Sequence, residues 1–126
     1  MAKKALVPLS GAETEILRLV WEKGRATVQN VCDTLPRNRK IAYATVQTLL
    51  RRLEKKGYIK HETVGKAHVF TPAVKPDHVI NSAVGSFLDK LFGGDPVPLM
   101  QYLAKHDKIT AADVEELKQL TAKSDS

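Results

Sequence analysis

The segment formed by residues 42–56 carries side chains whose types and spacing suit contact with DNA. If each residue is turned by about 100°, as in a helix, Val46, Leu49 and Leu53 fall on one face and polar or basic side chains fall on the opposite face. Such a helix packs through its apolar face and presents the other face to a partner. The residues that we expect to contact DNA from this helix are Tyr43, Ala44, Thr45, Gln47, Thr48, Arg51, Arg52 and Lys55.

The expected helix has two zones along its length. Near its start, Gln47 can pair with adenine through two hydrogen bonds, and the methyl groups of threonine and alanine can contact the methyl group of thymine. Further on, Arg51, Arg52 and Lys55 can reach phosphates, which set position and affinity but carry no direct sequence information. The alternative is a basic face that is only solvated. Additional cations near the same surface favour DNA binding over that alternative: Arg37, Arg39, Lys40 and Lys66.

Two further helices are expected ahead of this one. Ser10 and Glu13 have the spacing of a capping box, which predicts the start of a helix, and Gly24 predicts its end. Thr27 can cap a second, short helix that Pro36 would end. The sequence therefore predicts three helices in the first half of the chain.

A β-hairpin is expected after the third helix. Residues 58–64 and 67–72 are short runs rich in β-forming residues, and a two-residue turn separates them. Gly65 can supply the positive φ angle of a tight turn, which places Lys66 at the tip. Three helices followed by a hairpin with a basic tip predict a winged helix-turn-helix over residues 1–73, in a chain that is mainly α-helical.

Lys66 and His68 are the hairpin side chains that we expect to contact the DNA backbone or the minor groove. His61 and His68 can also be read as a metal-binding pair, because histidine is a frequent metal ligand. No carboxylate or thiolate stands at a ligand spacing that would complete a coordination shell. We therefore expect no metal site and no other cofactor.

The remaining residues, 74–126, predict a helical dimerisation domain. One amphipathic helix begins near Pro76, glycines at 93 and 94 end it, a second follows, and Thr110 caps a third. About fifty residues of helix bury too little surface for a stable unit, so we expect them to pack against a second copy rather than within a monomer. The residues expected at the dimer contact are Phe87, Leu88, Leu91, Phe92, Leu99, Met100 and Leu103.

The charge of the chain is unevenly distributed. Of its 126 residues, 20 are basic and 14 are acidic, giving a net charge of +6. Up to Pro72 there are 14 basic and 6 acidic residues, whereas the remainder has 6 basic and 8 acidic residues. A basic first half indicates an anionic partner, of which nucleic acid is the commonest.

Several classes of protein do not fit the sequence. Cys32 is the only cysteine, which excludes a disulfide within the chain and a cage of several thiolates around a metal. No stretch approaches the roughly 20 apolar residues of a membrane span, and no signal-peptide run follows the first lysines, so we expect a cytoplasmic protein without a membrane partner. Phosphate-binding glycine loops, histidine-rich metal motifs and nucleophile motifs are missing, so we do not expect an enzyme.

Several short motifs occur in a family-like order along nearly the whole chain. They are Leu9-Ser10 ahead of Glu13, Val20-Trp21-Glu22, the run TVQTLLRRL at 45–53, Lys55-Lys56-Gly57, Gly65-Lys66, Phe70-Thr71-Pro72 and Ser86-Phe87-Leu88. With these motifs the chain resembles the penicillinase-repressor family. The run at 45–53 is the most specific of them. The resemblance implies a homodimer that binds a palindromic operator overlapping a promoter, held together by its C-terminal helices.

The chain departs from the family pattern at three points. Ala42 and Ala44 stand where the best-known members have Ser and Lys, so we expect a different operator. In the antibiotic-resistance members an inducing protease cuts an Asn-Phe pair, and the aligned pair here is Gln101-Tyr102, the candidate proteolytic site. The copper-responsive branch uses a C-terminal cysteine cluster that this chain lacks. The resemblance therefore leaves the inducing signal open.

The leading hypothesis from the sequence is a dimeric, sequence-specific transcriptional repressor. The alternative is a winged-helix module that docks a partner protein and has only non-specific affinity for DNA. A switch that depends on metal binding by the histidines is a third reading. Selection from random duplex DNA separates the first two, and a chelator tests the third.

Overall fold

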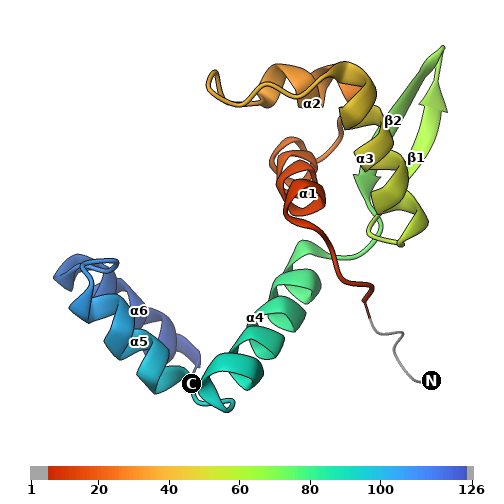
Figure 1. The fold of residues 1–126 in the computed structure, drawn as a ribbon. Coiled ribbons are helices and arrows are strands. Elements are labelled where there is room, and N and C mark those ends of the chain that lie inside the picture. Colours follow the sequence, from red (N-terminus) through yellow and green to blue (C-terminus); the bar gives the residue numbers. More distant parts are fainter. Residues whose placement is uncertain (1–5, 125–126) are drawn as a thin grey trace. The chain divides into compact units, whose positions relative to one another are not determined.

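The computed structural model describes residues 6–124, with side chains through Leu120. This part of the chain consists of helices α1–α6 and one antiparallel hairpin (Figure 1), which confirms the predicted mainly α-helical winged-helix class. Contacts divide the chain into one compact unit that ends at Ser82 and a second that begins at Ala83.

Helix α1 (Gly11–Lys23) begins at the predicted capping box. The Ser10 hydroxyl oxygen accepts a hydrogen bond from the Glu13 backbone N–H at 3.1 Å, and Glu13 Oε1 accepts one from the Ser10 N–H at 2.8 Å. The helix ends at Gly24, whose φ of 76° suits a residue without a Cβ atom. Both ends of α1 therefore lie where the local sequence predicts them.

Helices α2 (Val28–Thr34) and α3 (Tyr43–Lys55) follow. Thr27 caps α2 as predicted, and Asn30 Oδ1 accepts a hydrogen bond from the Thr27 N–H at 3.0 Å. Helix α3 is one residue shorter at each end than predicted. Ala42 is its N-cap, with extended backbone and no side-chain hydrogen bond, because alanine has no oxygen that could accept one.

The predicted hairpin consists of β1 (Ile59–Val64) and β2 (Ala67–Pro72), joined by a tight turn. Gly65 in the turn has a φ of 63°, as its position required. Ala26, in the connection between α1 and α2, adds a bridge to Phe70 through backbone hydrogen bonds of 3.0 and 2.8 Å. This bridge fastens β2 to the helical part of the unit. We call the hairpin, from β1 through β2, the wing.

One hydrophobic core holds α1, α2, α3 and the wing together. The apolar face predicted for α3 is confirmed, since its four large aliphatic side chains are at most 5 % exposed. Burying one such side chain contributes roughly 1.5–3 kcal/mol. The largest fully buried side chains are Ile16, Leu17, Val20, Val31, Val46, Leu50, Leu53 and Ile59. This core fixes the orientation of α3 relative to the wing.

Three more helices complete the chain: α4 (Pro76–Phe92), α5 (Pro96–Lys105) and α6 (Ala111–Ser124). All three were predicted, and the Thr110 cap of α6 is present at 3.2 Å. Val79 packs in the core of the first unit, so the division between the units falls within α4, nine residues beyond the boundary expected after residue 73. None of the helices in the described part of the chain combines the length and apolar character needed to cross a bilayer.

Candidate nucleic-acid interface

The face of α3 that points away from the core carries the side chains expected to contact DNA. Exposed along this face are Tyr43, Ala44, Thr45, Thr48, Arg51, Arg52 and Lys55, and Gln47 is half-buried. The Thr48 hydroxyl donates to the Ala44 carbonyl oxygen at 3.0 Å, which leaves the Thr48 oxygen able to accept and its methyl group exposed. Tyr43 is 51 % exposed despite its aromatic ring. The structure therefore presents a mixed polar, basic and methyl-bearing surface on one helix.

A cleft of about 430 Å³ lies between the start of α2, α3 and the wing. Half of the ten predicted DNA-contact residues line it: Tyr43, Gln47, Arg51, Lys66 and His68. The others, all on α3, lie outside its lining. Thr27, the N-cap of α2, and Gln29 of α2 also line the cleft, and the sequence had not marked either as a DNA-contact residue because they belong to a different part of the chain. The fold thus joins residues that are up to 43 positions apart, from Thr27 to Phe70.

An exposed face on a single helix is a kind of surface that double-stranded DNA can accept. The major groove of B-DNA is about 12 Å wide and admits one α-helix. The wing packs beside α3 (Figure 1).

The cations ahead of α3 differ in their surroundings. Arg39 Nε lies 3.1 Å from both carboxylate oxygens of Glu15 on α1, so its charge is compensated within the protein. Arg37 and Lys40 are exposed. The sequence had grouped all three as free positive charge, but Arg39 instead fastens the connection between α2 and α3 to α1.

Two histidines stack on the wing face that meets α3. The rings of His61 and His68 lie 4.3 Å apart between centroids, with their planes at 16°. His61 Nδ1 lies 2.6 Å from Glu54 Oε2 on α3, a contact that the sequence had not indicated. Because the two rings are nearly parallel, their nitrogen lone pairs do not point toward one position at which both could bind the same metal ion. Among the described residues there is no group of three side chains suited to hold a metal ion.

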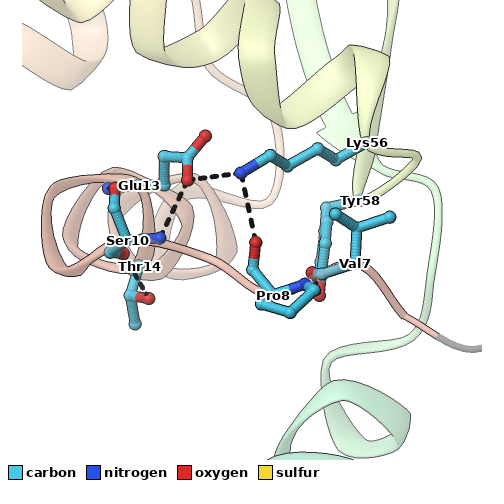
Figure 2. A network of polar contacts seen from close by, with 7 residues as sticks. All are labelled: Val7, Pro8, Ser10, Glu13, Thr14, Lys56 and Tyr58. Carbon is cyan, nitrogen blue, oxygen red and sulfur yellow. Dashed lines mark hydrogen bonds and ion pairs between the residues drawn. The ribbon is translucent and has the colours of Figure 1, made fainter.

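A polar network lies at the C-terminal end of α3 (Figure 2). Lys56 Nζ donates to Glu13 Oε1 at 2.7 Å and to the Pro8 carbonyl oxygen at 3.1 Å, and the Tyr58 hydroxyl donates to the Val7 carbonyl oxygen. Glu13 is 2 % exposed. The hydrogen bond from Lys56, followed by that from the Ser10 backbone, holds the pKa of Glu13 below its ordinary value despite burial. The network ties the end of α3 to the start of α1.

The second unit leaves much of its apolar surface exposed. Of the residues expected at a dimer contact, Phe87, Leu91 and Met100 are 45 %, 67 % and 47 % exposed. The other four, Leu88, Phe92, Leu99 and Leu103, are half-buried. Val84 is 47 % exposed and shares a face of α4 with Phe87 and Leu91.

A buried three-helix core, an exposed basic helix and a flanking hairpin define a winged-helix DNA-binding protein. A family model described as "Penicillinase repressor" matches residues 9–123. The chain belongs to the penicillinase repressor family, and family and fold together make it a DNA-binding transcriptional repressor. Transcriptional repressors are not a class of enzyme.

Individual relatives agree with this assignment. The penicillinase repressor of Staphylococcus aureus is 28 % identical over 120 residues, which covers 95 % of this chain and 94 % of the relative. The solution structure of the DNA-binding domain of the repressor BlaI is 30 % identical, with a TM-score of 0.51, over 59 % of this chain and 90 % of that one. The monomeric form of Bacillus licheniformis BlaI in complex with the blaP half-operator is 29 % identical, with a TM-score of 0.50, over 60 % of this chain and 92 % of that one.

Proposed function

We propose that the repressor acts in the cytoplasm as a homodimer on a palindromic operator, with one winged helix on each half-site. Repression follows from occupancy of the operator and involves no catalytic step and no cofactor. The cleft that gathers Tyr43, Gln47, Arg51, Lys66 and His68 carries the proposal. A related structure of similar fold is a complex with a half-operator, which supports operator DNA as the partner.

Helix α3 enters the major groove in this arrangement. Tyr43, Ala44, Thr45, Gln47 and Thr48, in its first turns, face base edges. Gln47 is the residue best able to discriminate bases, because its amide can donate and accept toward one adenine. Half-burial in the cleft restricts the Gln47 side chain and so favours a defined contact.

The phosphate contacts come from the later turns of α3 and from the wing. Arg51, Arg52 and Lys55 are exposed on α3, and Lys66 is exposed at the tip of the wing. Arg51 lines the cleft together with Lys66, so the two cations flank the space in which a DNA backbone would lie. Arg52 and Lys55 extend the basic surface outside the cleft.

The dimer is proposed to form through the second unit. Val84, Phe87 and Leu91 make an apolar stripe along α4, and Leu91 alone is 67 % exposed. A stripe of large exposed apolar side chains on one helix is unfavourable in water unless a partner covers it. A second copy brings an identical stripe, and two-fold symmetry then matches a palindromic operator. The half-buried Leu88, Phe92, Leu99 and Leu103, with Met100, complete the proposed contact.

The salt dependence of binding tests the DNA-contact face. We expect a protein that contacts about 6 to 10 phosphates to lose roughly 10³- to 10⁵-fold in affinity for a labelled duplex between 50 and 200 mM salt. Arg51→Ala should make the logarithmic salt slope shallower by about 0.9. Lys60→Ala removes another exposed cation, one that does not line the cleft, and it should change the slope less. Equal effects of the two substitutions would contradict the proposed face.

We propose Gln101-Tyr102 as the site at which an inducing protease would inactivate the repressor. Both side chains are exposed, and Tyr102 also packs its ring 4.1 Å from that of His106. The bond lies inside α5, and proteases cut extended chain, so cleavage requires α5 to unwind locally. Limited proteolysis followed by mass spectrometry should give fragments that end at Gln101. Cleavage confined to the connections between helices would refute this position.

A further inference from the structure

The stack of His61 and His68 lies in the cleft assigned to DNA. The two rings come from opposite strands of the wing and lie 4.3 Å apart. In the register of the hairpin, His61 is opposite Phe70 and His68 is opposite Thr63, so both histidines lie on the face that lines the cleft. The Phe70 ring packs next to the stacked histidines, with its centroid 5.6 Å from that of His61.

Glu54 holds His61 in place. Its Oε2 lies 2.6 Å from His61 Nδ1, and the two side chains are about one third exposed. An ionised carboxylate can only accept hydrogen bonds, so Nδ1 of His61 carries the hydrogen of this bond. His61 is thus fastened to α3 at one edge and offers its ring face to His68. His68 is exposed and has the freedom to face a ligand in the cleft.

Charged side chains from α3 and the wing line the cleft together with His68. Arg51 of α3, Lys66 of the wing and His61, when charged, oppose a positive charge on His68, and Glu54 favours it. No other charged side chain lines the cleft within the described residues. A DNA phosphate brought into this space offsets the repulsion among the cations.

We propose that Glu54 and His61 position His68 as a proton-dependent contact to a DNA phosphate, so that the repressor binds DNA more tightly as pH falls through the range in which histidine titrates. The inference rests on the proposed DNA-contact face. The complex takes up a proton from solvent at His68, and because the complex binds more protons than its free components, affinity rises as pH falls. Glu54 and His61 are positioning residues and need not touch DNA.

Binding of the full chain to a 30-base-pair duplex of random sequence tests this inference. Phosphate contacts do not depend on base sequence, so the operator is not needed. With a rhodamine label, whose emission is insensitive to pH in this range, anisotropy gives Kd at pH 6 and pH 8. We expect binding to be roughly fivefold tighter at pH 6, and the logarithmic salt slope to be steeper by about 0.9 for each phosphate gained.

Three substitutions distinguish the proposed phosphate contact of His68 from the positioning role of Glu54 and His61. His68→Gln removes the titrating ring and should abolish the pH-dependent gain. Glu54→Leu removes the anchor of His61 and should reduce the gain by more than half. Glu62→Leu is the matched control, because it removes a carboxylate from the opposite face of β1, where Glu62 pairs with Arg25 at 2.8 Å. This control should keep the gain of the wild type, and circular dichroism should show the same folded signal for each protein at both pH values.

The outcomes are distinguishable. A gain that survives in His68→Gln, or one that falls equally in Glu54→Leu and Glu62→Leu, would overturn the positioning of His68. Salt-dependent binding without any effect of pH would overturn this inference and leave the proposed function intact. Absence of binding at both pH values would overturn the proposed DNA face together with it.

Discussion

Lys56 Nζ lies 2.7 Å from Glu13 Oε1 across 43 residues of sequence. The contact joins the residue that ends α3 to the first turn of α1, and the same lysine reaches the Pro8 carbonyl oxygen. Because Glu13 is also part of the cap of α1, a single carboxylate serves both the start of α1 and the end of the DNA-contacting helix. This pair should therefore matter for stability.

Removing one partner of this pair should destabilise the fold. Lys56→Met leaves the Glu13 carboxylate buried without its cation, and we expect a loss of roughly 2–4 kcal/mol in the free energy of unfolding. Arg25→Met breaks an exposed ion pair with Glu62 and should cost less than about 1 kcal/mol. Urea unfolding followed by tryptophan fluorescence of Trp21 compares the two. Similar losses would show that the buried pair has no special role.

The same pair predicts how stability depends on pH. The pKa of Glu13 is lowered in the folded protein, chiefly by Lys56, so its contribution is present above its ordinary value of 4.5 and is lost as pH falls through the lower folded value. Wild type should therefore lose stability on acidification below about pH 5 more steeply than Glu13→Gln, which has no carboxylate to protonate. Urea midpoints measured from pH 7 to pH 3 give the comparison. If the urea midpoints of wild type and Glu13→Gln changed with pH in parallel, the lowered pKa of Glu13 would be ruled out.

Gln47 should determine base preference rather than overall affinity. Gln47→Ala removes the amide expected to contact adenine and should reduce discrimination at one or two base positions, by about 1–3 kcal/mol each. Competition with duplexes that carry single base changes measures this effect. Arg51→Ala is the comparison, since it should weaken binding to all these duplexes alike. If Gln47→Ala weakened binding to all these duplexes equally, Gln47 would instead contact the DNA backbone.

Leu91 should be required for dimerisation. Leu91→Asp introduces a charge into the apolar stripe of α4 and should shift sedimentation toward the monomer at micromolar concentration, because a carboxylate is costly to bury without a partner. Ser82→Asp places the same charge at an exposed position on the other side of α4 and should leave the dimer intact. A monomeric wild type would disprove the proposed contact.

Much of the fold could be predicted from local patterns. The caps at Ser10 and Thr27, the apolar face of α3 and the hairpin around Gly65 all depend on residues within a few positions of one another. Short-range hydrogen bonds and periodic burial correspond to residue patterns that can be recognised in the sequence. The predictions succeeded where the determining contacts are local.

The contacts that were missed join distant residues. Glu54 meets His61 only because the wing folds back on α3, and Arg39 meets Glu15 across 24 positions. Neither pair has a motif, since any acidic and basic residues can form one once tertiary packing brings them together. The same is true of Lys56 and Glu13, whose residues belong to family motifs although their contact was not evident from them.

Selection from random duplex DNA tests the central claim most directly. The full-length repressor is incubated with a random library, and the bound duplexes are amplified and sequenced over several rounds. A dimer that reads one half-site with each α3 should enrich a two-fold symmetric sequence, with half-sites about one helical turn, or a multiple of it, apart. Recovery of no enriched sequence, or of a single unsymmetrical half-site bound by one chain, would contradict the account.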